Sequence, residues 1–200
     1  MDFLYLLESI RVPVLDKLML LITHLGEETA FLVLALIVFW CVDKYHGYYM
    51  LGVGLLGNLL NQFLKITCRI PRPWVRDPDF TVVEAAKAEA DGYSFPSGHT
   101  QTAVGTFGAL AVTTKKRSLC ALFIILPLLV GFSRMYIGVH TPEDVLTSAA
   151  IAVLLLLLVY PMVMGKLERF TPWLLGVMVA LSVLFLGYVN NIGADIAGLS

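Results

Sequence analysis

The sequence predicts an all-α fold, a polytopic transmembrane bundle of about six helices with an interfacial amphipathic helix at its N-terminus. Composition is the first reason, because 58% of the residues are hydrophobic and only 14% are charged, with a mean hydropathy of +0.81. A soluble domain carries roughly 25% charged residues. The second reason is a series of long apolar stretches separated by short polar segments. The chain is therefore predicted to be an integral membrane protein.

The N-terminal segment, residues 1–16, is apolar but interrupted by charge. Asp2, Glu8, Arg11 and Asp16 leave no uninterrupted apolar run for a spanning helix or for the core of a signal peptide. We expect this segment to form an amphipathic helix that lies at the membrane interface.

Six later stretches approach the roughly 20 apolar residues that a spanning helix needs. They run near Leu18–Val42, Tyr48–Leu64, His99–Thr113, Leu119–Val139, Val145–Val163 and Trp173–Val189. The third is short and rich in Gly, Ala and Thr, which is typical of a helix packed inside a bundle. We expect a single membrane domain over residues 1–200, with a core at residues 18–163 and an extra transmembrane helix at residues 173–189.

Charge and cysteine content exclude several classes of function. The formal net charge is -1 and the one compact basic run is Lys115-Lys116-Arg117, so nucleic acid is not an expected partner. The three cysteines do not have the spacing of metal ligands or of a disulfide framework. The bilayer is the expected partner, with no metal and no cofactor, and the oligomeric state stays open.

Three polar clusters fall on the same side of the membrane once the spans are placed, although spans separate them. They are Lys65 with Arg72-Pro73, then Pro96-Ser97-Gly98-His99, then Ser133-Arg134 with His140 and Asp144. Independent scatter would put some of these residues in the opposite loops. Their shared side therefore predicts that they converge on one site.

The opposite side carries Lys44, the run at residues 115–117, Lys166 and Arg169. Cytoplasmic loops tend to have an excess of Lys and Arg, but the side with the clusters carries no fewer cations, so the count alone does not decide the orientation. We expect a multi-pass plasma-membrane protein with the clusters on the extracytoplasmic side.

The first cluster combines two kinds of cation. Pro71 and Pro73 flank Arg72, which predicts that the helix ends before Arg72 and that a stiff turn holds its guanidinium. A guanidinium binds two phosphate oxygens, and the Lys65 ammonium adds compact charge. The cluster suits a phosphate group, although basic residues that reach lipid headgroups from a helix end give the same pattern.

The second cluster predicts a helix start that is open to an anion. Ser97 is expected to cap the third helix, and Gly98 lets a ligand approach the free backbone N–H groups. His99 then lies in the first turn, within reach of a bound phosphate. A capped helix start with an incidental histidine is the alternative.

The third cluster contains both a helix start and a candidate nucleophile. Thr141 is predicted as the N-cap, Pro142 as the first helical residue and Asp144 as the third, in a capping-box-like start. A carboxylate hydrogen-bonded to one imidazole nitrogen fixes the tautomer and stabilises the cation that follows attack. We therefore expect His140 to be a nucleophile that Asp144 supports.

Taken together, the clusters resemble the signature motifs of the type 2 phosphatidic acid phosphatase superfamily, which also contains vanadium haloperoxidases. The resemblance covers about residues 18–163, and it rests on Lys65-x6-Arg72-Pro73, Pro96-Ser97-Gly98-His99 and Ser133-Arg134-x5-His140-x3-Asp144. The chain departs from the family's common plan at its ends, because many members have a spanning helix before the one that begins here near Leu18.

The resemblance implies a metal-independent phosphatase that acts on lipid phosphates. His140 would form a phosphohistidine, Asp144 would support it, and His99 would protonate the leaving group and later activate water. The phosphate would be held by Lys65, Arg72, Ser97, Gly98 and Arg134.

Substrate choice is expected to depend on the segment between the first two clusters. Trp74, Phe80, Tyr93 and Phe95 are candidates to contact a lipid tail, because aromatic residues gather at headgroup depth. An ordinary aromatic belt explains them equally well. Phosphatidate, phosphatidylglycerophosphate and a polyprenyl diphosphate such as undecaprenyl diphosphate all fit the pattern.

Two other functions stay open. A vanadate-dependent haloperoxidase would use the same cradle for vanadate, but the chain is suited to a bilayer. A non-catalytic binder or transporter of lipid phosphates would need the cations but could do without His140 and Asp144, so the presence of these two residues argues against it. His24 and His46 lie away from the clusters and are given no role.

Overall fold

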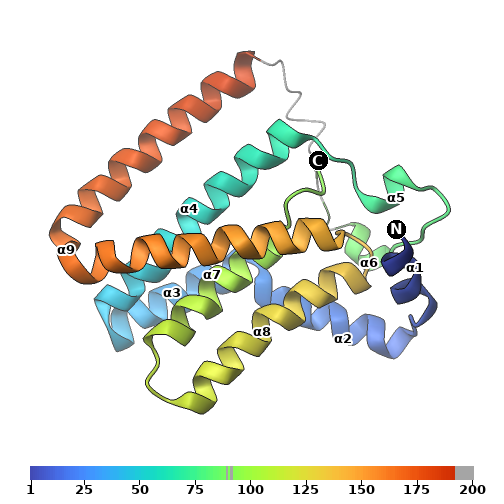
Figure 1. Cartoon of the computed structure of the whole chain (residues 1–200), viewed down its shortest axis with the longest axis horizontal. Coiled ribbons are helices and arrows are strands. Elements are labelled where there is room, and N and C mark those ends of the chain that lie inside the picture. The colour runs from blue at the N-terminus through green and yellow to red at the C-terminus, as the bar shows by residue number, and fades with distance from the viewer. Residues whose placement is uncertain (89, 91, 192–200) are drawn as a thin grey trace.

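The structure is a computed structural model that describes residues 1–88, 90 and 92–191. Within these residues all regular secondary structure is helical (Figure 1), which confirms the predicted all-α class. The elements are α1 (Asp2–Ser9), α2 (Pro13–Thr23), the 3-10 turn η1 (His24–Gly26), α3 (Glu28–Ile37), the π turn η2 (Val38–Val42), α4 (Lys44–Cys68), α5 (Pro73–Arg76), α6 (Glu84–Lys87), α7 (Gly98–Thr113), α8 (Arg117–Tyr136) and α9 (Pro142–Asn191).

The N-terminal segment is more divided than predicted. Helix α1 ends at Ser9, and Val12 is extended before Pro13 begins α2, because proline fixes φ and suits the first helical position. Leu4 and Leu7 of α1 are buried. Residues 1–16 thus form one short helix and the start of a second, and their location at a membrane interface stays a prediction.

The stretch predicted at Leu18–Val42 is a broken pair of helices. Helix α2 stops at Thr23, η1 makes a tight turn, and the segment that starts at Glu28 is bent from the first by 51°. Gly26 is needed in this turn, since a Cβ there would lie 2.7 Å from the His99 carbonyl oxygen. The apolar residues on both sides hid the break, because a spanning helix and a bent pair have the same overall composition.

Helix α7 lies at the centre of the bundle, as its small residues predict. It packs against α4, α8 and α9 and buries Ala103 and Ala109 completely. A Cβ on Gly108 would come within 2.4 Å of Leu156 Cδ1 in α9, so glycine permits this close approach. Helix α4 ends at Cys68, about one turn beyond Leu64, where the second stretch was predicted to end, and before Arg72 as expected.

The fifth and sixth predicted stretches form the two halves of α9. The backbone is non-helical at Lys166, with φ of -149° and ψ of 62°, and Figure 1 shows the chain turning back there. The second half packs on α4, where the Phe63 ring meets the rings of Phe185 and Tyr188. The segment between the two predicted stretches, residues 164–172, is helical except at Lys166.

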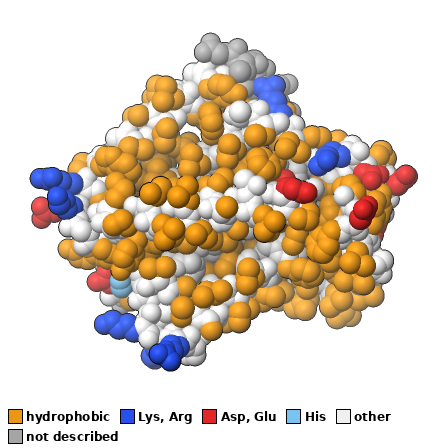
Figure 2. Space-filling view, in the orientation of Figure 1, with side chains coloured by type: hydrophobic (Ala, Val, Ile, Leu, Met, Phe, Trp, Pro, Cys, Tyr) orange, Lys and Arg blue, Asp and Glu red, His pale blue; other side chains and the backbone are white. Residues whose placement is uncertain are grey.

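The described residues contain two helices, α8 and α9, that are long and apolar enough to cross a membrane, and the bent pair adds a third crossing if it spans as one unit. Helix α7, with 16 residues, is shorter than the roughly 20 that a span needs. Hydrophobic side chains cover the middle of the face in Figure 2, and charged ones lie mainly toward its ends. The count of about six spans stays a prediction.

Candidate active site

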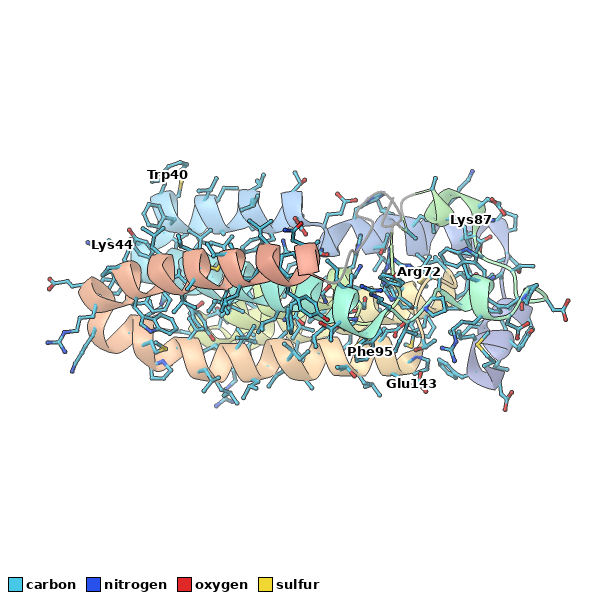
Figure 3. The ribbon with its side chains drawn as sticks, turned by 90° about the horizontal axis from the view of Figure 1, so that it is seen from above. Trp40, Lys44, Arg72, Lys87, Phe95 and Glu143 are labelled. Atoms are coloured by element: carbon cyan, nitrogen blue, oxygen red, sulfur yellow. The ribbon has the colours of Figure 1, made fainter. Side chains whose placement is uncertain are left out.

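One cavity of about 360 Å³ collects residues from all three sequence clusters. Six of the predicted site residues line it, namely Lys65, Arg72, Gly98, His99, Arg134 and His140. They come from the ends of α4, α7 and α8 and from the adjoining loops. Figure 3 shows Arg72 at the end of the bundle opposite Trp40 and Lys44. The fold therefore brings together segments that lie far apart in the sequence.

The ring of His140 is held on both sides. Arg72 Nη1 lies 3.0 Å from its Nε2, and Asp144 Oδ2 lies 3.3 Å from its Nδ1. Because a guanidinium only donates, Nε2 is the acceptor and the proton sits on Nδ1, facing Asp144. Burial of the ring, followed by the positive charge of Arg72, lowers the pKa of His140 well below its usual range. His140 is therefore a neutral imidazole with a defined tautomer.

The carboxylate oxygen Oδ2 of Asp144 joins this ring to the start of α9. It accepts hydrogen bonds from Ser94 Oγ at 2.5 Å and from the Thr141 backbone N–H at 2.8 Å. The Asp144 N–H donates in turn to Thr141 Oγ1 at 3.4 Å, which completes the predicted capping box. Pro142 follows as the first helical residue, as predicted. These donors fix the carboxylate and hence the orientation of the His140 ring.

Ser97 and Gly98 shape the start of α7. The fully buried Ser97 accepts at Oγ from the Thr100 N–H at 3.4 Å, which confirms the predicted N-cap. Gly98 and His99 line the cavity, so the open N–H groups of the helix start adjoin the space where an anion would bind. The Ser97 side chain serves the cap and is not among the described residues that line the cavity.

Three cations approach the cavity from different elements. Arg72 Nε donates to the Gly92 carbonyl oxygen at 3.1 Å. Arg134 is 2% exposed and donates from Nη1 to Thr23 Oγ1 at 2.8 Å. Lys65 lies in the last turn of α4. Oxygen acceptors thus hold both guanidinium groups in place, and together with the ammonium they make this part of the lining strongly positive.

The remaining lining residues are not predicted from the sequence: Gly26, Glu27, Glu28, Gln62, Gly92 and Thr102. His24 lies outside the lining, yet it hydrogen-bonds Glu27 within it. Thr23 and Ser94, which support Arg134 and Asp144, were missed as well. The available signal was the pair of adjacent carboxylates inside the first apolar stretch, because charge within a spanning segment usually has a function.

The four aromatic residues expected near a lipid tail do not occur among the described lining residues of this cavity. Phe80 is 3% exposed and packs on a tyrosine ring of α1. Trp74 lies beside the site, with its ring centre 6.0 Å from the Arg72 guanidinium carbon. Phe95 lines a second cavity of about 430 Å³, and Tyr93 is half-buried in the loop before α7. Contact with a lipid tail stays a prediction.

Metal ligation has no evident place among the described residues, where no group of three or more His, Cys, Asp or Glu side chains could hold an ion. The cavity offers instead two imidazoles, three cations and a helix start. This set can bind a phosphoryl group, attack it and transfer a proton. Metal-independent chemistry stays a prediction.

The model of the PAP2 superfamily matches residues 45–168, which is more than half of the chain and includes all three clusters. The chain belongs to the PAP2 superfamily. This confirms the resemblance on which the site residues were assigned. The relatives of the chain are named as phosphatases, hydrolases that act on phosphoric esters, and the chain is an enzyme of this class.

Two curated PAP2 relatives come from Bacillus subtilis (strain 168). Phosphatidylglycerophosphatase B is 32% identical over 165 residues, which cover 75% of this chain and 76% of the relative. Undecaprenyl-diphosphatase BcrC is 33% identical over 144 residues, which cover 71% of this chain and 72% of the relative. The crystal structure of a transmembrane PAP2 type phosphatidylglycerolphosphate phosphatase from Bacillus subtilis matches with a TM-score of 0.67 at 28% identity over 84% of each chain. The fold is thus that of a transmembrane PAP2 protein.

Proposed function

We propose that the chain is a lipid phosphatase that hydrolyses a phosphate monoester or diphosphate through a phosphohistidine at His140. The observation that carries this proposal is the hydrogen bonding of the buried His140 ring, with Asp144 at Nδ1 and Arg72 at Nε2. A neutral imidazole with a fixed tautomer is what nucleophilic attack requires. Relatives named as a phosphatidylglycerophosphatase and an undecaprenyl-diphosphatase support a lipid substrate.

In the first step, His140 Nε2 forms a bond to phosphorus while the bond from phosphorus to the leaving oxygen breaks. His99 gives a proton to that oxygen, so a monoester releases a neutral alcohol and a diphosphate releases a lipid monophosphate that carries this proton. The positive end of the α7 dipole disfavours an imidazolium at His99, and the negative charge of the bound phosphate offsets this effect. Asp144 stabilises the positive charge that His140 acquires.

Binding of the phosphate oxygens falls to residues around the same cavity. Lys65, Arg72 and Arg134 neutralise negative charge in the transition state. The backbone N–H of Gly98 adds a donor at the helix start, whereas the Ser97 N–H already donates to the Asp144 carbonyl oxygen at 3.3 Å and Ser97 supports the site as the cap of α7. This arrangement needs no metal ion to stabilise the developing charge.

In the second step, a water molecule attacks the phosphohistidine. His99, now neutral, accepts a proton from the water as the bond between phosphorus and His140 Nε2 breaks. Inorganic phosphate leaves and both imidazoles return to their starting protonation states. The same residue acts as acid and then as base, as microscopic reversibility requires.

We infer that residues 1–200 make up one membrane phosphatase domain, with the catalytic core at residues 18–163 and an extra transmembrane helix at residues 173–189. Phosphatidate, phosphatidylglycerophosphate and polyprenyl diphosphates are the candidate substrates. Lys44 lies at the end of the bundle opposite Arg72 (Figure 3). We propose that this end is cytoplasmic and that the site faces the extracytoplasmic side of the plasma membrane.

The deciding experiment measures phosphate release by the detergent-purified protein from lipid phosphates and diphosphates in the presence of EDTA. We expect release by the original chain and by His46→Ala, a matched control at the far end of the bundle, and none by His140→Ala. Rapid quenching with radiolabelled substrate should trap an acid-labile, alkali-stable phosphoprotein in the original chain. Binding of lipid phosphate without release would instead indicate a binder or transporter.

A further inference from the structure

We propose that Glu28, with Glu27 beside it, selects the alcohol part of the substrate. The preferred substrate is then a lipid phosphate monoester with a hydroxyl or ammonium group next to the ester, in preference to a lipid diphosphate. This assignment rests on the proposed lipid phosphatase function. It concerns the part of the cavity lined by Glu27, Glu28, Gln62 and Thr102, none of which takes part in the chemical steps above.

The cavity has room for more than the group that is transferred. Its volume of about 360 Å³ falls in the range of roughly 300–1,000 Å³ found for small-molecule pockets. The cations, the imidazoles and the start of α7 surround the phosphate. Atoms of the alcohol next to the ester oxygen must therefore occupy the rest of the cavity.

The break between α2 and α3 brings both carboxylates to this space. Glu28 begins α3 directly after the turn at Gly26, and both residues line the cavity. Within the described part of the chain the Glu28 side chain makes no hydrogen bond or ion pair, although its charge interacts with that of Lys65, whereas Glu27 is bonded to His24. An ionised carboxylate accepts hydrogen bonds and donates none. The group that it recognises on a substrate is therefore a donor.

Charge separates the two substrate classes. The lining combines Lys65, Arg72 and Arg134 with two carboxylates, so one phosphate is matched by cations and anything beyond it meets negative charge. The second phosphate of a diphosphate would bring like charges together, which is unfavourable. A hydroxyl or ammonium group at the same place makes a charge-assisted hydrogen bond.

The test compares kcat/KM for three lipids and several variants of the full-length protein in detergent. Lysophosphatidate and phosphatidate with the same acyl chain differ near the ester by one free hydroxyl, and a polyprenyl diphosphate represents the other class. We expect the original chain to prefer lysophosphatidate to both. Glu28→Gln lowers this preference roughly tenfold, and Glu28→Ala, which also removes the acceptor, lowers it further. The matched control Glu168→Gln, at the turn of α9, leaves the preference unchanged.

An unchanged preference in both Glu28 variants would overturn the assignment of Glu28 while leaving the phosphatase proposal intact. A preference of the original chain for the diphosphate would do the same. Absence of release from every lipid by folded protein would overturn the proposed function, and this assignment with it.

Discussion

The residue whose environment matters most is His140, since its two ring nitrogens face opposite partners. We expect Asp144→Asn to lower kcat by about 10³-fold or more, because an amide no longer stabilises the imidazolium and can turn its NH₂ toward Nδ1, which reverses the tautomer. Phosphate release at saturating substrate is the measurement. Because the same side chain completes a capping box, thermal unfolding should also show a loss of about 1 kcal/mol. Full activity in this variant would exclude the proposed role of Asp144.

The protonation state of His140 predicts how activity depends on pH. Attack requires the neutral imidazole, and burial followed by the charge of Arg72 lowers its pKa well below the usual value. Protonation of His140 therefore reduces kcat/KM only far below pH ~6.5, the pKa of an ordinary histidine. A pH profile of kcat/KM in a buffer series checks this, and an acid limb centred near pH ~6.5 that His140 explains would contradict it.

The same lowered pKa affects stability, with a definite sign. Below pH ~6.5 the His140 of the unfolded chain binds a proton that the folded chain does not, so unfolding becomes more favourable as the pH falls. We expect the melting temperature in detergent to decrease across this range more steeply for the original chain than for His140→Gln. If the melting temperature of both proteins fell equally with pH, His140 would not contribute to the pH dependence of stability.

At the scale of elements, the break between α2 and α3 supports the site from the side. Thr23 Oγ1 accepts from Arg134 Nη1 at 2.8 Å, and both residues are buried. Thr23→Val removes this acceptor and leaves a buried N–H of the Arg134 guanidinium without it, at a cost of roughly 1–3 kcal/mol in free energy. We expect KM to rise about tenfold while Thr23→Ser stays close to the original chain. Equal KM values in all three proteins would argue against a positioning role.

The turn at Gly26 lies directly against His99. A Cβ there would come within 2.7 Å of the His99 carbonyl oxygen and 2.8 Å of Val130 Cγ1, so Gly26→Ala forces the turn or α7 to shift. We expect a loss of about 1–3 kcal/mol of stability together with reduced activity. Gly176→Ala is the matched control, since nothing lies within 4 Å of its Cβ. Similar melting temperatures for the two variants would contradict the close packing.

For the whole molecule, orientation in the membrane can be measured from two exposed positions at opposite ends. Asp79 lies beyond α5 at the end that contains the site, and Lys116 lies in the loop between α7 and α8. In a variant without the native cysteines, Asp79→Cys should react with a membrane-impermeant maleimide in intact cells. Lys116→Cys should react only after the cells are opened. The reverse pattern would place the site in the cytoplasm.

The sequence predicted well those features that local chemistry determines. Ser97 and Thr141 cap their helices as expected, because a side chain and the N–H two or three positions later decide a cap by themselves. The apolar stretches likewise located most helices. The position of a bend is different, since both sides of it are equally apolar. That is why the break at Gly26, and with it Glu27 and Glu28 in the cavity, was not predicted.

The positions of the aromatic residues could not be predicted from the sequence. Phe80 and Trp74 lie in the segment between the first two clusters, and their aromatic rings at the expected headgroup depth suggested contact with a substrate. The structure packs Phe80 against α1 and puts Trp74 beside Arg72, because the loop that carries them folds back onto the N-terminal segment. Long-range packing of a loop is not encoded in spacing or composition, so such placements need the three-dimensional structure.

The hydrogen bond from Arg72 to His140 occupies the Nε2 lone pair in the resting protein. A neutral electrophile that enters the cavity therefore meets a shielded ring, whereas a phosphate brings oxygen atoms that can replace Nε2 as the acceptor for the guanidinium. Arrival of the anion itself thus uncovers the reactive nitrogen. The protein can keep a strong nucleophile in a lipid environment and still direct its reactivity to anionic esters, so histidine acylating reagents should modify His140 slowly in the resting protein.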